Sequence, residues 1–233
     1  MMLWQSRIRL VDEVADAIRE QIYAGRLEPG APLRQEQMAG ELGISRTPLR
    51  EALRLLEKEG LVTVVPGRGV RVALVDYHEL LAAYAVREVL DGLASRLTAE
   101  LGDRRIFERL SATIDQQEAA LASTLPVTYI AENVVFHTIQ YEAVANPYLA
   151  SQVPLLRMTA TQILLPIPVV TPERVGRAVT QHRAILGAIT EGDPQEAERL
   201  ARLHIRDTAD SIRRALPDAT DGALRSHATP TTA

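Results

Sequence analysis

The sequence predicts a mainly α-helical protein in which three helices and a β-hairpin precede an all-α helical bundle. The first observation behind this fold class is a pair of amphipathic segments on either side of Gly43, followed by two β-rich segments at 61–65 and 70–74. The second is that the sequence from Asp76 onward predicts a series of consecutive helices and shows no alternating strand pattern.

The first helix is predicted from apolar residues that recur at helical spacing, namely Val11, Val14, Ala15, Ile18 and Ile22. It is expected to stop near Gly25, and the turn-rich segment 27–33 then connects it to a short helix at about 34–42. Gly43 ends that short helix. A tight Gly-containing turn between two helices is typical of a helix-turn-helix.

The next helix begins at Ser45 and carries two chemically different faces. Ser45 is expected to cap its N-terminus, and Pro48 falls in the first turn, where a missing N–H costs nothing. One face is apolar and consists of Leu49, Leu53 and Leu56. The other carries an arginine at every fourth residue, namely Arg46, Arg50 and Arg54. An arginine face suits DNA, although in isolation it is more typical of a solvated surface.

Two β-rich segments follow, and 66–69 (Pro-Gly-Arg-Gly) between them predicts a hairpin tip. A helix-turn-helix followed by such a hairpin is a winged helix-turn-helix. Four linked motifs, at 27–30, 42–53, 59–62 and 67–70, support this interpretation. On these motifs, residues 7–75 resemble the DNA-binding domain of the GntR family of bacterial transcription regulators.

The resemblance implies that a recognition helix and a wing contact DNA, through Ser45, Arg46, Thr47, Arg50, Arg68 and Gly69. An arginine near the start of a helix in the major groove can donate two hydrogen bonds to guanine, so Arg46 and Arg50 are the best candidates for reading bases. Ser45 and Thr47 suit phosphates. Arg54 and Arg71 are as compatible with ordinary surface charges as with DNA contacts.

Composition is consistent with a regulator. The net charge is −4, yet residues 1–75 hold 11 basic against 10 acidic side chains, whereas 76–233 hold 15 against 20. DNA affinity must therefore come from individually placed arginines. Cysteine is absent, which excludes disulfides and thiolate chemistry. Without a signal peptide or an apolar run long enough to span a membrane, the protein is expected to be cytoplasmic.

Glycine and proline divide the second part into helices expected at 77–101, 104–123, 127–145, 147–165, 172–191 and 194–216. The clearest boundary is Gly192-Asp193-Pro194, where Gly192 ends one helix, Asp193 caps the next and Pro194 takes its first position. Residues 76–216 are therefore expected to form one helical domain. Residues 217–233 have few large apolar side chains and are expected to form a disordered tail.

The histidines of this domain are spaced in an informative way. His182 lies eleven residues before Asp193 and His204 eleven after it, so an antiparallel hairpin would hold both at one height. Asn133 and His137 form an i, i+4 pair on another helix. Three imidazoles and one oxygen could converge on a divalent metal in a bundle core. From spacing alone, separate hydrogen-bonded histidines remain the alternative.

Motifs at 133–137 (Asn-x-x-Phe-His) and 181–185 (Gln-His-x-x-Ile) match those of a known effector domain. On these motifs, residues 76–216 resemble the all-helical FCD domain of the FadR subfamily within GntR. The resemblance implies a metal ion, and the ligands it implies are Asn133, His137, His182 and His204. Many metal-binding members carry Asp at position 133, and a neutral Asn should lower affinity. Zinc is the expected metal, with nickel or manganese as alternatives.

The resemblance also implies that a small carboxylate effector binds at this metal. Arg87 matches the family's arginine on the first helix of the domain and could pair with a carboxylate, although a surface salt bridge to Asp91 is the simpler alternative. Arg157 and Thr161 share a helical face and are weaker effector-binding candidates. His78 and His227 are not expected to be ligands.

These observations predict a homodimeric, ligand-responsive transcription repressor that a small carboxylate releases from operator DNA. One short recognition helix reads only a few base pairs, so the operator is expected to be a pseudo-palindrome bound by two subunits. The protein is not expected to be an enzyme, because no acidic residue is placed by motif to serve a metal-bound water. A helical metal-dependent enzyme, or an interaction module with a structural metal, fused to the DNA-binding domain, are the alternatives.

Overall fold

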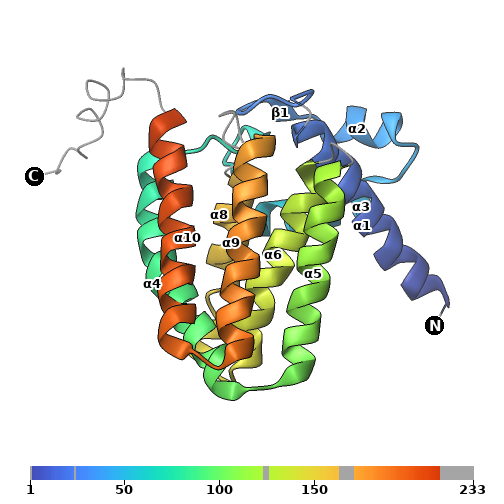
Figure 1. Ribbon diagram of the computed structural model, residues 1–233. Helices are drawn as coiled ribbons and strands as arrows, with labels where there is room; N and C mark the ends of the chain where they lie inside the picture. Colours follow the sequence, from blue (N-terminus) through green and yellow to red (C-terminus); the bar gives the residue numbers. More distant parts are fainter. Residues whose placement is uncertain (1, 24, 123–125, 163–170, 216–233) are drawn as a thin grey trace, which may run out of the picture.

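The computed structural model describes residues 2–23, 25–122, 126–162 and 171–215, and Figure 1 shows their arrangement. The fold is mainly helical, as the sequence predicts, and a three-stranded antiparallel sheet lies beside the N-terminal helices. The predicted tail at 217–233 lies outside the described residues. Among the described helices, none has the length and apolar character needed to cross a membrane.

The N-terminal unit consists of α1 (Met2–Tyr23), α2 (Gln35–Glu41) and α3 (Arg46–Lys58), with a sheet against them. Gly43 adopts φ +65° between α2 and α3, a left-handed conformation that favours glycine. The apolar face of α3 is buried in the core that it shares with α1 and the sheet, as Leu49, Leu53 and Leu56 show. The two-faced helix therefore forms as predicted.

Ser45 is the residue at which the prediction for α3 is wrong. It occupies the N-cap position with extended backbone, but its side chain makes no capping hydrogen bond. The hydroxyl of this exposed residue therefore remains available to another partner. Capping requires a specific side-chain rotamer as well as the right residue type, and sequence position cannot supply that information.

The sheet contains β2 (Val62–Val65), β3 (Gly69–Val72) and a short strand β1 (Pro32–Leu33), in the order β1-β3-β2. The hairpin of β2 and β3 was predicted, with Val62 opposite Val72 and Val65 opposite Gly69. The strand β1 was not predicted, because the turn-rich segment that contains it was predicted to be a connecting loop. It pairs with β3 across about forty residues of chain, and no local pattern encodes such a pairing.

The bundle contains helices with these bounds: α4 (Tyr77–Leu101), α5 (Arg104–Ala122), α6 (Pro126–Ala143), α7 (Pro147–Ala150), α8 (Val153–Gln162), α9 (Pro172–Glu191) and α10 (Pro194–Ala215). In Figure 1, α4, α10, α9 and α5 run side by side, and α6 packs on α5. The largest buried cluster lies mainly between α5, α6 and α9. It places the middle of the bundle, where the histidines lie, away from solvent.

The single helix predicted at 147–165 is wrong, because the structure divides it into α7 and α8. Pro154 explains the break. In a continuous helix its ring would clash with the carbonyl of residue 150, whereas in the first turn of α8, which begins at Val153, proline is tolerated. Residues 163–165 of the predicted helix lie outside the described residues.

The hairpin of α9 and α10 forms as predicted. Gly192 ends α9 with φ +70°, and its amide donates to the carbonyl of Ile189. Asp193 then caps α10 by accepting a hydrogen bond from the amide of Glu196, at 3.0 Å. This turn fixes the register of the two helices and so the relative height of the histidines that they carry.

Candidate functional site

Three histidines from three helices converge in the middle of the bundle. His137 comes from α6, His182 from α9 and His204 from α10, and all are buried. One ring nitrogen from each lies within 4.8 Å of the others, and the Nε2 atoms of His182 and His204 are 3.2 Å apart. The expectation that the α9–α10 hairpin holds two histidines at one height is therefore confirmed.

Each imidazole is oriented by an oxygen at its other nitrogen. The Nδ1 of His137 lies 2.7 Å from Asp91 Oδ1, and the Nδ1 of His182 lies 2.7 Å from Gln117 Oε1. The Nδ1 of His204 lies 2.8 Å from Gln181 Oε1. Because these oxygens accept hydrogen bonds, each Nδ1 carries the proton and each Nε2 presents a lone pair.

The two glutamines are themselves held in orientation. Gln117 donates its Nε2 to the carbonyl of Glu132 at 3.3 Å, and Gln181 donates its Nε2 to Asp207 Oδ2 at 3.3 Å. Their oxygens must therefore face the imidazoles. With both Nδ1 atoms protonated, the Nε2 lone pairs of His182 and His204 point at each other and repel unless a cation lies between them. This donor set fits a divalent metal ion.

Burial keeps the three imidazoles neutral. It lowers the pKa of His137, and it lowers the pKa of His182 and His204 well below the ordinary value of 6.5. The neighbouring imidazoles and Arg174 lower the pKa of the last two further, because they disfavour another positive charge. Neutral imidazoles are the form that binds metal.

The free energy of unfolding of the metal-free protein is expected to fall as the pH drops from about 7.5 to about 5.5. The unfolded histidines bind protons near pH 6.5, whereas the folded ones have a lowered pKa, so the unfolded state holds more protons here. Each such group contributes at most about 1.4 kcal/mol per pH unit to the slope, a limit approached below pH 6.5. Urea unfolding in a chelator, at several pH values, measures it. A flat profile would show that the folded imidazoles are not protected from protons.

Asp91 lies at the centre of a buried ion pair behind His137. It accepts hydrogen bonds from Arg87 Nε at 3.1 Å, from Arg87 Nη2 at 3.2 Å and from the hydroxyl of Tyr141 at 2.9 Å. Burial alone would raise the pKa of Asp91, but Arg87 and His137 hold it well below its usual range. The sequence shows Asp91 only as a possible partner of Arg87, and its contact with a histidine of another helix carries no sequence signal.

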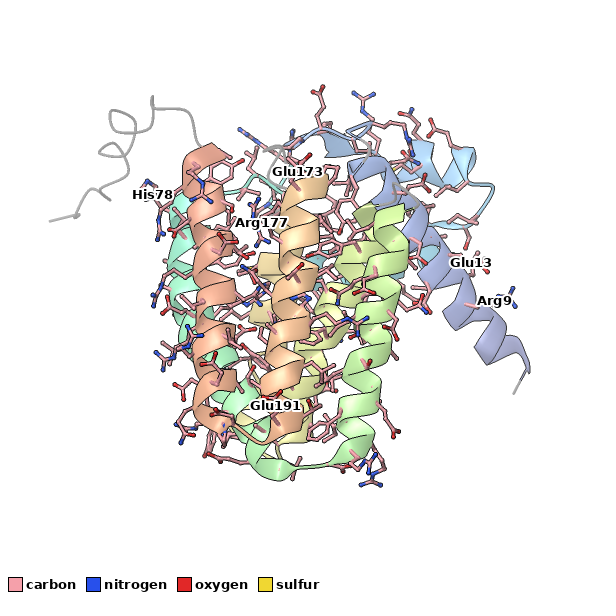
Figure 2. All side chains as sticks on the ribbon, in the orientation of Figure 1. Arg9, Glu13, His78, Glu173, Arg177 and Glu191 are labelled. Atoms are coloured by element: carbon pink, nitrogen blue, oxygen red, sulfur yellow. The ribbon has the colours of Figure 1, made fainter. Side chains whose placement is uncertain are left out.

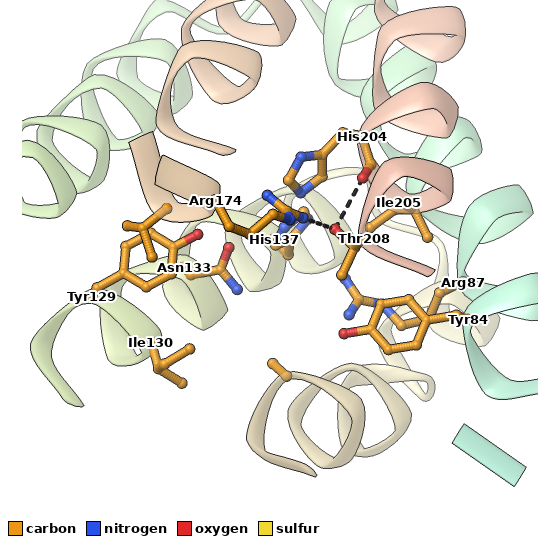
Figure 3. A pocket seen from close by; sticks show the side chains of 12 residues that line it. Tyr84, Arg87, Tyr129, Ile130, Asn133, His137, Arg174, His204, Ile205 and Thr208 are labelled. Carbon is orange, nitrogen blue, oxygen red and sulfur yellow. Dashed lines mark hydrogen bonds between the residues drawn. The ribbon is translucent and has the colours of Figure 1, made fainter. Parts of the chain in front are cut away.

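A pocket of about 40 Å³ opens beside the cluster and is shown in Figure 3. Asn133, one turn before His137 on α6, is half-buried and lines this pocket. Arg87 lines it as well, although Asp91 and the hydroxyl of Thr159, at 3.0 Å from Nη1, already occupy its guanidinium. The pair with Asp91 is buried, in contrast to the surface salt bridge that was the alternative in the sequence.

Of the two weaker effector candidates, Arg157 is not among the described residues that line this pocket. Arg157 is exposed and lines a separate hollow, formed with Arg19 and Glu59 of the N-terminal unit and with Val134 of α6. Thr161 belongs to α8, but its side chain lies outside the described residues. The sequence places Arg157 and Thr161 on one helical face, but it cannot show that Arg157 lines a hollow separate from the histidines.

Arg174 is a charged lining residue that the sequence analysis did not select. It follows the N-cap Thr171 of α9, is only 8% exposed, and lines the pocket together with His137 and His204. Its Nη2 donates to the hydroxyl of Thr208 on α10. In the sequence it is one of several arginines, and only the tertiary structure shows that it is buried.

A second concave surface lies on the N-terminal unit, between α2, α3 and the hairpin of β2 and β3. Four of the predicted DNA-contacting residues line it: Arg46, Arg50, Arg68 and Gly69. Arg34, which the sequence analysis did not select, lines it too. Ser45 and Thr47 are exposed at the start of α3 but are not among its lining residues. Arg46 is bridged to Glu36 at 3.2 Å, an exposed pair that should break at little cost.

Two family models match the chain, one over each part. The model described as "Bacterial regulatory proteins, gntR family" matches residues 10–72, and the model of the FCD domain matches residues 79–207. The first range contains the arginine-lined surface, and the second contains all three histidines.

Curated relatives match over most of their own length. A "probable D-xylose utilization operon transcriptional repressor" from Paenarthrobacter nicotinovorans is 31% identical, over 86% of this chain and 87% of that protein. The Glc operon transcriptional activator of Escherichia coli K12 is 26% identical, over 84% of this chain and 86% of that protein. The repressor NanR of Cronobacter sakazakii is 25% identical, over 86% of this chain and 84% of that protein. All three are named as transcription regulators.

Solved structures share the fold along nearly the whole chain. McbR/YncC of E. coli superposes with a TM-score of 0.70 at 21% identity, covering 88% of this chain and 97% of that one. A GntR regulator from Rhodococcus sp. RHA1 superposes with a TM-score of 0.71 at 20% identity, covering 89% and 99%. At this level of identity the likeness concerns the fold alone.

Proposed function

The chain belongs to the GntR family of bacterial regulatory proteins and carries an FCD domain, and we propose that it is a repressor controlled by a small carboxylate at the histidine cluster. It is a DNA-binding transcription regulator, like its matched relatives. Residues 7–75 form the DNA-binding domain of this proposal, and residues 76–216 form the effector domain.

The observation that carries the proposed control site is the convergence of three Nε2 lone pairs, each fixed by an acceptor at Nδ1. His137, His182 and His204 would hold a divalent metal, with Asn133 as a neutral fourth donor. All four ligands are uncharged, so a bound dication keeps its full charge. Zinc suits the imidazole-rich set, and nickel or manganese are the alternatives.

The metal, when bound, supplies positive charge and an open coordination position for a carboxylate. This chain's own residues exclude bulk water from the centre, hold the imidazole tautomers and place two arginines along the pocket wall. Effector binding would change the spacing of two DNA-binding domains in a homodimer, as a population shift between two arrangements. The lower-affinity arrangement would release the operator.

Selection of duplexes from a random library by the full-length protein tests the DNA-binding part of this proposal. The arginine-lined surface of one subunit spans only a few base pairs, so the enriched sequences should contain two inverted half-sites about one helical turn apart, or a multiple of it. Enrichment of a single half-site would contradict the dimer, and no enrichment would contradict specific recognition.

A further inference from the structure

A buried cation that has no anionic partner among the described residues lines the histidine pocket. Arg174 is more than nine-tenths buried, yet its Nε has no hydrogen-bond partner in the part of the chain that the structure describes. Its Nη2 donates a hydrogen bond to the neutral hydroxyl of Thr208, which in turn donates to the carbonyl of His204 at 3.0 Å. Among the described residues, no carboxylate forms an ion pair with Arg174.

The other arginine of this pocket, Arg87, has the anionic partner that Arg174 lacks among the described residues. Arg87 lines the same pocket and is equally buried, but Asp91 accepts two hydrogen bonds from it. A buried charge without a partner is costly and is usually compensated by an ion pair or a bound ion. Arg174, Asn133 and His137 all line this pocket (Figure 3). An anion bound in the pocket would meet both this guanidinium and a metal at the histidines.

We propose that Arg174, held by Thr208, is the residue that binds the carboxylate of the effector, and that the effector is a compact acid without an amine. This inference rests on the proposed metal-and-carboxylate function and names the residue and ligand class of that same site. Guanidinium and carboxylate match in geometry, and the free Nε is one of the donors of such a pair.

The restriction to a compact acid without an amine follows from the lining of the pocket. The pocket is small, about 40 Å³, and therefore favours compact acids. Its charged lining residues among those described are two arginines, and the one nearby carboxylate, Asp91, is already paired with Arg87 and His137. An ammonium group would therefore find no anionic partner. A hydroxyl of the ligand could form a hydrogen bond with the hydroxyl of Tyr129, which stays protonated because burial raises its pKa to about 12.

Calorimetric titration of the metal-loaded full chain tests the inference with formate, acetate and lactate as probes, and with alanine as the amine counterpart of lactate. At least one of the acids should bind, and Arg174→Met should weaken that binding about 10- to 100-fold, the loss expected for a charged hydrogen-bonded pair. Arg177→Met is the matched control. Arg177 is exposed on the same helix, and its removal should leave the affinity unchanged (Figure 2).

A second measurement separates binding from folding. Removing an unpaired buried charge should leave the melting temperature of the acid-free protein unchanged or raise it, whereas loss of a structural contact would lower it. Should Arg174→Met fail to fold, Arg174→Lys keeps a charge but loses the Nε donor, and it should still weaken binding.

The outcomes distinguish this inference from the function on which it rests. If the metal binds and an acid binds equally to the wild type and to the folded variant, the role of Arg174 is wrong and the proposed function stands. If alanine binds as tightly as lactate, the ligand class is wrong. If the metal-loaded wild type binds none of the acids, the proposed effector site fails and this inference fails with it.

Discussion

Arg46→Ala or Arg50→Ala is expected to abolish sequence-specific DNA binding while the metal content stays unchanged. Both side chains are exposed and line the surface between α2, α3 and the hairpin. A bidentate arginine–guanine contact discriminates by about 1–3 kcal/mol, and a homodimer loses two of them, so affinity should fall roughly 30-fold to more than 10⁴-fold. Fluorescence anisotropy with a selected duplex measures this change.

Arg54→Ala is the control on the same helix. Arg54 is exposed on α3 but is absent from the lining of that surface, so its loss should weaken binding to all duplexes slightly and equally. An Arg46→Ala or Arg50→Ala protein that still prefers the selected duplex over a scrambled one would show that α3 does not read bases through these residues.

His182→Ala is expected to have the opposite pattern, losing the metal while keeping DNA binding. His182 is fully buried, stacks on Phe136 with ring centroids 4.3 Å apart, and supplies one of the three converging Nε2 atoms. Changes to outer-shell residues typically cost 10- to 100-fold in metal affinity, so loss of a ligand should cost more than about a hundredfold. Metal analysis after dialysis measures it.

His78→Ala is the matched control, because His78 lies exposed at the start of α4 (Figure 2) and does not belong to the cluster. This variant should keep the wild-type metal content. His182→Ala also removes a buried ring, so its fold must be checked by circular dichroism, and His182→Gln, which retains more volume, serves as a second variant. A folded His182 variant with full metal content would show that the metal site is elsewhere.

The parts of this structure that sequence could predict are those that local chemistry encodes. The Gly192-Asp193-Pro194 turn fixes a helical hairpin, so equal spacing from it was enough to place His182 and His204 side by side. The leucine face of α3 likewise followed from its period. Glycine, proline and helical periodicity act within a few residues, and they therefore remain visible in one sequence.

The features that sequence could not predict depend on contacts between distant segments. The strand β1 exists only because β3 lies beside it, and the pairing of Asp91 with His137 joins α4 to α6. The burial of Arg174 depends on the packing of α9 against α10, where Arg174 contacts Thr208. The break at Pro154 is different, because proline chemistry encodes it locally and the prediction of one helix overlooked it.

The central claim is that the histidine pocket of the bundle controls the DNA-binding unit. The most direct test is the affinity of the metal-loaded full-length protein for its selected duplex, by fluorescence anisotropy, with and without a saturating concentration of an acid that binds it. We predict that the acid weakens DNA binding at least fivefold, the lower end of typical allosteric coupling. Equal affinity with the acid bound would contradict the claim and leave the metal with a structural role.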